Sequence, residues 1–418
     1  MSERKRIYLC LAHMSESGLE QKYIKEAFDT NWVVPLGPNV NGFEADLETF
    51  VGEDKRVVAL SAGTAAVHLA LLACGVGLGD EVLVQSFTFC ASSHPVTYLG
   101  ATPVFIDSEP DTWNMDPVLL EEAVKDRILK TGRKPKAIVP VALYGMPYDI
   151  ERIMEIANRY EIPVVEDAAE GFGSKFKGQV LGTFGKFGVL SFNGNKMITT
   201  SGGGALICSD SESKNKIMWY ATQAREAYPY YQHEEIGYNY RMSNICAGIG
   251  RGQMTVANAH IAHHKHVQVL YEELLADVKG VHVQKAPSAD YDSNYWLCTI
   301  TLDENVKVVG QEKAYGNAIT AAVGGAAGVI HVGGGVHTDC EPNQNVEAMR
   351  MYLDAAQIEA RPLWKPMHKQ PVYAKSPAYV NGVSEALFKV GMCLPAGPYV
   401  SDEDVHYIVE KIKEAIVK

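Results

Sequence analysis

Short apolar segments recur through the first half of the chain and are separated by longer stretches of helical periodicity. The segments are rich in valine, isoleucine and leucine and too short for helices, as is typical of strands buried on both faces of a sheet. The pattern predicts strands at Val57–Leu60, Glu81–Val84, Pro103–Ile106, Ala137–Leu143, Pro163–Val165, Gly188–Leu190 and Ala205–Ile207.

The stretches between these strands leave room for crossover helices. The predicted ones include Thr64–Cys74, Leu119–Leu129 and Ile150–Tyr160. Apolar strands that alternate with helices indicate a mostly parallel sheet covered on both faces, and ligands of such sheets bind beyond the carboxyl ends of the strands. Those ends fall at Ser61, Ser86, Asp167 and Ser191.

The pattern changes after residue 245. Residues 245–275 have the periodicity of one long helix, and a strand at Trp296–Leu302 and an amphipathic helix at Asp402–Val417 follow. We expect an N-terminal segment and a large domain within residues 1–270, and a small C-terminal α+β domain within residues 271–418. The glycine-rich segment 323–335 fits no element, so a flexible loop and close backbone packing both remain open.

The composition is that of a globular protein: 418 residues, 47% hydrophobic. A formal charge of -12 argues against nucleic acid as a partner. The eight cysteines form no C-x-x-C pair, which indicates reduced thiols and a cytoplasmic location. No run of about 18 apolar residues occurs, so no membrane span is expected.

Lys196 lies in Ser191-Phe-Asn-Gly-Asn-Lys196, close to Gly194 and to the glycines 202–204. Permissive residues around a lysine suggest a backbone crowded against a ligand, although most lysines are solvated surface charges. An amine, a carboxylate at a strand end and a phosphate-binding helix N-terminus are the groups that a pyridoxal phosphate (PLP) enzyme needs. The combination predicts an aminotransferase, with Lys196 as the imine-forming and proton-carrying residue.

Asp167 ends the strand of Val164-Val-Glu-Asp167 and could hold the ring nitrogen of PLP protonated, or could simply cap a helix. Gly63 and Thr64 open a helix whose free N–H groups favour an anion, and Ser191 could add a hydroxyl. Phe89 could place an aromatic face on the pyridine ring, or could be ordinary core. Each motif alone is weak evidence for a PLP site. Because the motifs share a position at strand ends, together they make the prediction strong.

Other motifs are less informative. Gly75-Val-Gly-Leu-Gly79 precedes a strand instead of following one, so it is a turn and not a dinucleotide fingerprint. His260, His263, His264 and His266 are expected on an exposed helix face, with no metal site. The tyrosines between Tyr228 and Tyr240 could form an interface or line a sugar or nucleotide pocket.

The run of Ser61-Ala-Gly-Thr64, Ser86-Phe-Thr-Phe89, Glu166-Asp-Ala-Ala169, Ser191 through Lys196 and Gly237-Tyr-Asn-Tyr-Arg241 resembles the DegT/StrS-type nucleotide-sugar aminotransferases. The resemblance extends from Asn31 to Gly397. It implies the α/β fold type I of PLP aminotransferases, with a large, mostly parallel seven-stranded α/β/α domain and a smaller C-terminal α+β domain. It also implies a homodimer with active sites at the subunit interface.

The resemblance assigns roles to single residues. It makes Lys196 the catalytic imine lysine, Asp167 the pyridinium partner and Phe89 the stacking ring. Gly63, Thr64 and Ser191 then hold the phosphate, Asn239 reaches it from the neighbouring subunit, and Arg241 is a candidate contact for substrate anions.

Glu170, Thr200-Ser-Gly-Gly203 and Arg361-Pro-Leu-Trp-Lys-Pro-Met-His368 look like the bacillosamine-pathway branch. That branch uses L-glutamate to aminate UDP-2-acetamido-2,6-dideoxy-4-ketohexose at C4. Glu170 could orient a substrate amide or hydroxyl, or could interact with a helix dipole. Candidates for the uracil and the glutamate carboxylate are Arg225, Arg241, Arg361 and His368.

Several rival functions remain. The nearest is a 3-aminotransferase for a dTDP-keto sugar. A PLP dehydratase is disfavoured because those relatives typically replace the lysine with histidine. A non-catalytic PLP-binding regulator is disfavoured by the intact Lys196 and Asp167, and an NAD-dependent oxidoreductase by the missing fingerprint. The configuration at C4 stays open.

Overall fold

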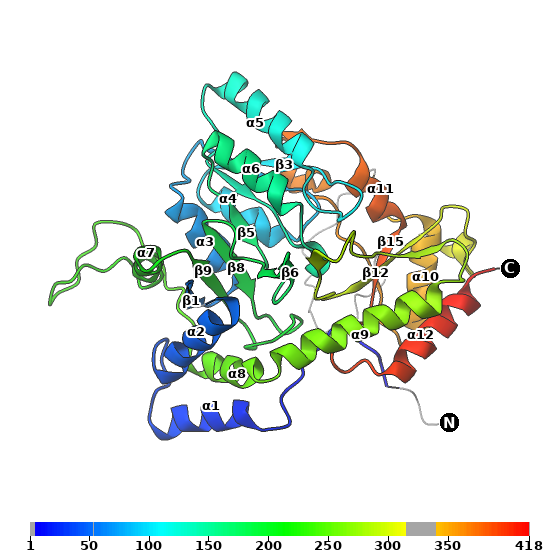
Figure 1. Cartoon of the computed structure of the whole chain (residues 1–418), viewed down its shortest axis with the longest axis horizontal. Coiled ribbons are helices and arrows are strands. Elements are labelled where there is room, and N and C mark those ends of the chain that lie inside the picture. Colours follow the sequence, from blue (N-terminus) through cyan, green and yellow to red (C-terminus); the bar gives the residue numbers. More distant parts are fainter. Residues whose placement is uncertain (1–4, 53, 315–339, 418) are drawn as a thin grey trace.

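The computed structural model describes residues 5–52, 54–314 and 340–417. Figure 1 shows a larger lobe and a smaller lobe side by side, with helix α9 (Ala257–Leu275) running along both. The large α/β domain and the smaller C-terminal α+β domain expected from the sequence are both present. The glycine-rich segment 323–335 lies outside the described residues.

The larger lobe is built on one sheet with the strand order β1-β9-β8-β5-β4-β2-β3-β14, in which single bridges between β4 and β5 join two four-stranded halves. Strand β9 is antiparallel to both of its neighbours, and the other strands run parallel to one another. The bounds are β1 Arg56–Leu60, β2 Glu81–Gln85, β3 Thr102–Ile106, β4 Ala137–Val139, β5 Val165–Asp167, β8 Phe187–Ser191, β9 Gly204–Cys208 and β14 Ala378–Tyr379.

These strands confirm the mostly parallel seven-stranded sheet, and the short β14 extends it from the C-terminal half of the chain. Strand β4 is shorter than the predicted Ala137–Leu143. Pro140 follows it directly and has no N–H to donate, so regular pairing stops and only Val141 bridges Asp167.

Alternate residues of each strand face opposite helix layers, because successive side chains of a strand point to opposite faces. Val57 and Ala59 join the core formed with α2, α5, α6 and α8, whereas Val58 and Leu60 join the core formed with α3, α4 and α7. The bounds are α1 Leu19–Asp29, α2 Pro38–Val51, α3 Gly63–Ala73, α4 His94–Tyr98, α5 Pro117–Thr131, α6 Ile150–Tyr160, α7 Ser211–Ala221 and α8 Asn244–Met254.

The long helix predicted over residues 245–275 is two helices. Helix α8 ends at Met254 and α9 begins at Ala257. Between them the N–H groups of Thr255 and Val256 bond to carbonyls three residues back, at Gly252 and Gln253, so the backbone tightens and the α-helical ladder is interrupted. The hydrophobic periodicity continues across this break, which explains why the sequence predicts one helix.

The smaller lobe has an antiparallel sheet ordered β10-β12-β15-β13 and its own core. Ile7, near the N-terminus, pairs with Ile358 and belongs to this core. The smaller lobe therefore includes a residue from the range 1–270, which was expected to hold only the N-terminal segment and the large domain. The bounds are β10 Val281–Val283, β12 Cys298–Leu302, β13 Arg361–Pro362, β15 Gly391–Leu394, α10 Gln344–Ala355, α11 Val383–Val390 and α12 Asp402–Ala415.

Besides α9, two segments of the described chain connect the lobes. The chain leaves β13, passes the turn Met367–Lys369 and adds β14 to the edge of the large sheet. Strand β11 (Tyr291–Asp292) extends the hairpin of β6 (Lys175–Phe176) and β7 (Gln179–Val180). Within the described ranges, no helix has the length and apolar character needed to cross a membrane.

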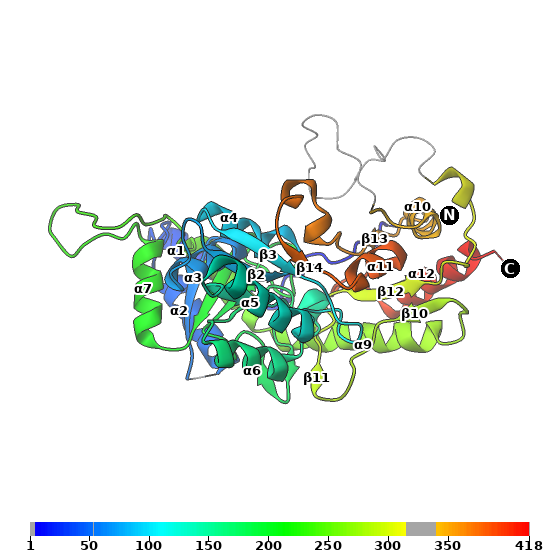
Figure 2. The same cartoon turned by 90° about the horizontal axis from the view of Figure 1, so that it is seen from above.

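Residues 225–238, which follow α7, form an arm that projects from the larger lobe in Figures 1 and 2. Its side chains Tyr230, Tyr231 and Ile236 are 59%, 78% and 83% exposed. Large apolar groups exposed on a projecting segment mark a surface suited to contact with another chain.

Candidate active site

A cavity of about 330 Å³ lies where the carboxyl ends of β1, β5 and β8 meet the smaller lobe. Its walls combine small polar residues, two buried carboxylates, one lysine and aromatic rings. The predicted site residues that line it are Gly63, Thr64, Phe89, Asp167, Glu170, Ser191 and Lys196. The structure therefore brings together side chains that are far apart in the sequence.

Lys196 is held by the loop that follows β8. Its backbone N–H donates to the carbonyl of Asn193, and the indole N–H of Trp296 donates to the carbonyl of Asn195 at 2.7 Å. The side chain is 13% exposed, and Nζ lies 4.1 Å from the centre of a Trp296 ring. These contacts place the amine inside the cavity, not on the surface.

The glycines near Lys196 only partly match the expected crowding. A Cβ on Gly203 would lie 2.2 Å from Thr200 Oγ1, and one on Gly204 would lie 2.4 Å from the backbone N of Gly63. Gly194 and Gly202 have no neighbour within 4 Å of such a Cβ. The close approach is therefore between the start of β9 and the start of α3.

Asp167 is buried at the end of β5. Its Oδ2 accepts a 2.6 Å hydrogen bond from the Ser92 hydroxyl, and its Oδ1 accepts one from the N–H of Ala169. Burial raises the pKa of Asp167, while these two hydrogen bonds and the charge of Lys196 act against that rise. The neighbouring Glu166 points elsewhere and accepts backbone N–H groups of Gly182, Phe184 and Gly185.

Glu170 is 5% exposed and also faces the cavity. Its Oε1 lies 3.5 Å from Lys196 Nζ, and its Oε2 accepts a 2.8 Å hydrogen bond from the N–H of Tyr144. Burial raises the pKa of Glu170, and the charge of Lys196 and the Tyr144 N–H oppose this. The sequence made Glu170 a candidate for orienting a substrate group or for interacting with a helix dipole, and the structure places its carboxylate against the lysine.

The first turn of α3 faces the cavity with Gly63 and Thr64. The preceding residue, Ala62, has no side-chain acceptor and leaves the helix uncapped. N–H groups of the first turn have no partner within the helix, so they are available to an anion, which the helix dipole also favours. A Cβ on Gly63 would lie 3.1 Å from that of Ser191, so the Ser191 side chain stands directly beside this turn.

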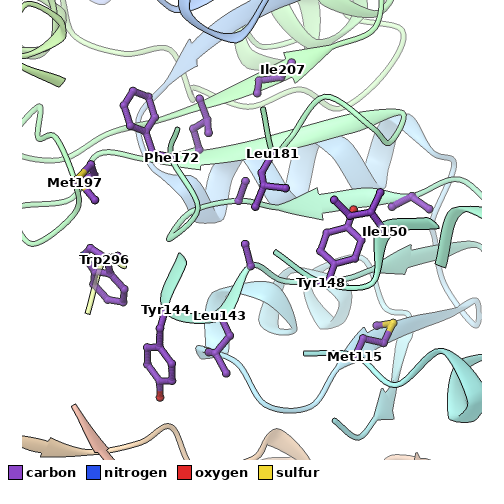
Figure 3. Packing of buried hydrophobic residues seen from close by; sticks show 14 of the residues in the cluster. Met115, Leu143, Tyr144, Tyr148, Ile150, Phe172, Leu181, Met197, Ile207 and Trp296 are labelled. Atoms are coloured by element: carbon purple, nitrogen blue, oxygen red, sulfur yellow. The ribbon is translucent and has the colours of Figure 1, made fainter. Parts of the chain in front are cut away.

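Three aromatic residues complete the walls. Phe89 is 49% exposed, and its ring centre is 5.4 Å from that of Trp364. Trp364 and Trp296 come from the smaller lobe, and the sequence interpretation did not assign either to the site. Two sequence features could have pointed to them. Trp296 begins a predicted strand, and Trp364 lies within the Arg361–His368 motif. Figure 3 shows Trp296, Tyr144 and Met197 together on one side of the buried cluster.

Four residues that were predicted to contact substrate are not in the wall of this cavity and bind other groups of the protein. They are Arg225, Arg241, Arg361 and His368. Arg241 is buried in an ion pair with Glu44 at 2.7 Å, so its expected role toward substrate anions is not supported. Arg361, half exposed on β13, pairs with Glu359 at 2.7 Å. Arg225 lies in the arm, stacked over the Tyr231 ring.

His368 is also not in the cavity wall. Its Nδ1 is 2.6 Å from the Ser86 hydroxyl and its Nε2 is 3.1 Å from Glu385, so it fastens the smaller lobe to the end of β2. This buried link does not support the predicted contact between His368 and substrate, which stays a prediction. Asn239 is exposed next to the arm and pairs with Thr222, outside this chain's own cavity.

The histidines of α9 were expected to be exposed, which is wrong for two of them. His260 and His264 are buried, and their Nδ1 atoms contact the carbonyls of Met197 and Tyr295. That face of α9 packs against the Lys196 loop and the smaller lobe, which the periodicity alone does not reveal. Across the described parts of the chain, no cluster of three or more histidine, cysteine or carboxylate side chains is arranged to hold a metal ion.

Comparison with known proteins adds independent information. A sequence model of the DegT/DnrJ/EryC1/StrS aminotransferase family matches residues 15–325 and 332–413. EpsN of Bacillus subtilis (strain 168), which carries the name of a pyridoxal phosphate-dependent aminotransferase, is 42% identical over 97% of this chain and 95% of its own. A GDP-perosamine synthase of Escherichia coli O157:H7 is 34% identical over 97% of this chain and 98% of its own.

A solved structure agrees with these sequence matches. The crystal structure of a DegT/DnrJ/EryC1/StrS aminotransferase from Brucella abortus has a TM-score of 0.81 and 26% identity, and the match covers 96% of each chain. The similarity therefore includes both lobes and the junction at which the cavity lies.

Proposed function

Because the chain belongs to the DegT/DnrJ/EryC1/StrS aminotransferase family, we propose that it moves the amino group of L-glutamate to C4 of a UDP-2-acetamido-2,6-dideoxy-4-ketohexose. The chain is a PLP-dependent sugar aminotransferase, which requires an amino donor and a nucleotide-linked sugar. The proposal adds the C4 position, the UDP group and glutamate. The product would be a UDP-4-amino sugar of the bacillosamine type.

One observation carries the catalytic part of this proposal. A lysine amine, a buried carboxylate and an uncapped helix N-terminus share one cavity, and these are the groups that PLP requires. The residues therefore fit the cofactor. Gly63, Thr64 and Ser191 would hold its phosphate, and Asp167 its ring nitrogen. When bound, PLP supplies an electron sink for the carbanion formed at the amino-bearing carbon.

The chain supplies the remaining functions. The Nζ of Lys196 can bind the cofactor covalently and, once released, carry a proton to and from the reacting carbon. Phe89 and the two tryptophans line the cavity and offer flat faces to rings. Glu170, beside Lys196, would orient an amide or hydroxyl of the sugar.

We also propose a homodimer whose active sites lie at the subunit interface. The exposed apolar side chains of the arm fit a contact with a second copy of the chain. Asn239, beside the base of the arm, would then reach the phosphate of the neighbouring site. The proposal includes the cytoplasmic location expected from the cysteines.

The identity of the nucleotide is the open choice. The resemblance of residues 361–368 and of Glu170 favours UDP, whereas the similarity to a GDP-perosamine synthase favours GDP. The dTDP-keto sugars of the rival 3-aminotransferase form a third class. The sugar class therefore has to be measured directly.

The test is an absorbance titration of the PLP-loaded protein. L-glutamate should convert the lysine-bound cofactor to its amine form, and UDP-4-keto-6-deoxy-N-acetylglucosamine should restore the original spectrum. GDP- and dTDP-linked 4-keto-6-deoxy sugars are the matched comparisons. If only the GDP-linked or only the dTDP-linked sugar restores the spectrum, the aminotransferase activity stands and the UDP substrate is rejected. A failure of glutamate to change the spectrum would reject the donor.

A further inference from the structure

Glu170 and Lys196 form an ion pair at the wall of the cavity. The two side chains are only 5% and 13% exposed, and Glu170 Oε1 lies 3.5 Å from Lys196 Nζ. A carboxylate this close to the reacting amine interacts with the lysine itself, in addition to any contact that it makes with substrate.

The backbone at Tyr144 fixes the direction of this carboxylate. Its N–H donates to Glu170 Oε2 at 2.8 Å, which leaves Oε1 turned toward Nζ. Tyr144 has φ 54° and ψ 15°, in the left-handed region that bulky residues rarely adopt. Such a conformation persists only where surrounding contacts impose it, and here the hydroxyl of Tyr144 accepts a hydrogen bond from the N–H of Trp364.

Three groups near Nζ interact favourably with the charge of a lysine ammonium. The Glu170 carboxylate is one, the face of Trp296 at 4.1 Å is another, and the charge of the buried Asp167 is a third. A lysine attacks a carbonyl carbon only as the neutral amine. Some group must therefore remove a proton from Lys196 each time the lysine forms its bond to the cofactor.

Of the two buried carboxylates, Glu170 is the better placed to do this. Both oxygens of Asp167 accept hydrogen bonds from other groups, Ser92 and Ala169. Glu170 directs Oε1 at Nζ itself. The raised pKa of Glu170, caused mainly by burial, suits a carboxylate that gains and loses a proton.

We propose that Glu170 is the proton acceptor for Lys196. Oε1 takes one proton from the Nζ ammonium, which leaves a neutral amine and a neutral carboxylic acid. The amine would then form its bond to the carbonyl carbon, and the carbonyl oxygen would leave as water. When water cleaves this bond the steps reverse, and Glu170 gives the proton back to Nζ. When the donor amine displaces the lysine, Nζ leaves as the neutral amine that can accept a proton. This role does not depend on which sugar the enzyme uses.

The test measures how fast PLP binds to the full-length protein after the cofactor has been removed, with no sugar or amino donor present. Uptake is followed by the absorbance of the lysine-bound cofactor across a range of pH. Glu170→Gln keeps an oxygen for the Tyr144 N–H but cannot accept the proton. Its uptake should be about tenfold to a hundredfold slower at neutral pH and should recover as hydroxide takes over the deprotonation.

Two controls accompany this variant. Glu170→Asp, which keeps a carboxylate, should retain the wild-type shape of the pH profile. Glu121→Gln makes the same chemical change at a surface ion pair with Lys125 and should bind PLP at the wild-type rate. If Glu170→Gln does not fold, Glu170→Ala with added formate replaces it, and faster uptake on adding formate supports the proposal.

Three results would overturn it. Uptake by Glu170→Gln that is slowed equally at every pH indicates a packing role. Unchanged uptake with a raised KM for the keto sugar indicates a substrate contact only. In the Glu170→Ala experiment, no effect of formate contradicts proton transfer. Because no sugar is used in the uptake measurement, rejection of the UDP substrate would leave these results intact.

Discussion

The hydroxyl of Ser92 donates a 2.6 Å hydrogen bond to Oδ2 of Asp167, across 75 positions of sequence. Ser92 is itself 2.8 Å from the hydroxyl of Thr88. Both residues are buried, so the carboxylate is held in one orientation beyond the end of β5. A carboxylate fixed in this way can face the ring nitrogen of PLP without having to reorganise.

Asp167→Asn should separate the charge of this residue from its shape. The amide can still interact with Ser92 but cannot stabilise a pyridinium, so turnover should fall by about a hundredfold or more while PLP still binds. Ser92→Ala removes only one hydrogen bond and should cost about tenfold or less. Steady-state rates and the cofactor content of each purified variant measure both effects. Equal turnover of Asp167→Asn and wild type would remove Asp167 from its role.

Lys196→Ala should abolish both the absorbance of the lysine-bound cofactor and turnover, because no other amine lines the described cavity. PLP should still bind, more weakly, through the α3 N-terminus. Lys265→Ala is the matched control, since Lys265 pairs with Asp292 outside the cavity. Normal turnover by the Lys196 variant would end the catalytic assignment.

Much of this site could be predicted because its parts follow local rules. Apolar strands specify the sheet, and the carboxyl ends of its strands specify where a ligand binds. Asp167, Ser191 and the first turn of α3 all occur at such ends, so their meeting in one cavity follows from the topology.

The remaining features depend on contacts between distant segments. Arg241 looks like an anion ligand in the sequence, yet Glu44 on α2 neutralises it. His264 looks solvated, yet the smaller lobe covers it. Trp296 and Trp364 reach the cavity only because the smaller lobe packs against the end of the large sheet. Periodicity within one segment carries no information on which distant residue will meet it.

Removing the link made by His368 should reduce stability more than substrate binding. His368→Ala leaves the buried Ser86 hydroxyl without this partner and removes a hydrogen-bond partner from Glu385, at a cost of about 1–3 kcal/mol. Thermal unfolding should shift to lower temperature while KM for the keto sugar changes little. A large rise in KM with unchanged unfolding would restore the substrate role first expected for His368.

Acid should destabilise the protein through the buried histidines of α9. Burial lowers the pKa of His264 to about 3 and also lowers the pKa of His260. The unfolded chain therefore binds protons near the ordinary histidine pKa of about 6.5, before the folded chain does. Their contribution to stability is fully present above that value and is lost as the pH falls from it toward the folded-state pKa.

His264→Asn tests this effect, because the amide can still donate to the Tyr295 carbonyl but does not titrate. Between about pH 7.5 and about pH 5.5 the unfolding free energy of wild type should fall by about 1 kcal/mol more than that of the variant. His406→Asn, an exposed change on α12, should follow wild type. Parallel pH profiles for wild type and His264→Asn would contradict the assignment.

Mixed dimers test whether each active site is shared between two chains. Asn239→Ala should weaken PLP retention enough to leave the neighbouring site nearly inactive when no PLP is added, and Lys196→Ala should inactivate its own site. In a dimer that carries one variant in each chain, two-fold symmetry places both defects in one site and leaves the other intact. Co-refolding equal amounts of the two nearly inactive proteins should therefore restore about a quarter of wild-type activity. About half of the dimers are mixed, and one of the two sites in each mixed dimer is intact.

Mixing Lys196→Ala with Asp167→Ala is the matched control. Both residues line the cavity of the same chain, so each site of that mixed dimer carries one defect and no activity should return. No recovery in the first mixture would contradict a contribution of Asn239 to the neighbouring site. Recovery in the control would contradict the placement of Lys196 and Asp167 in one site of the same chain.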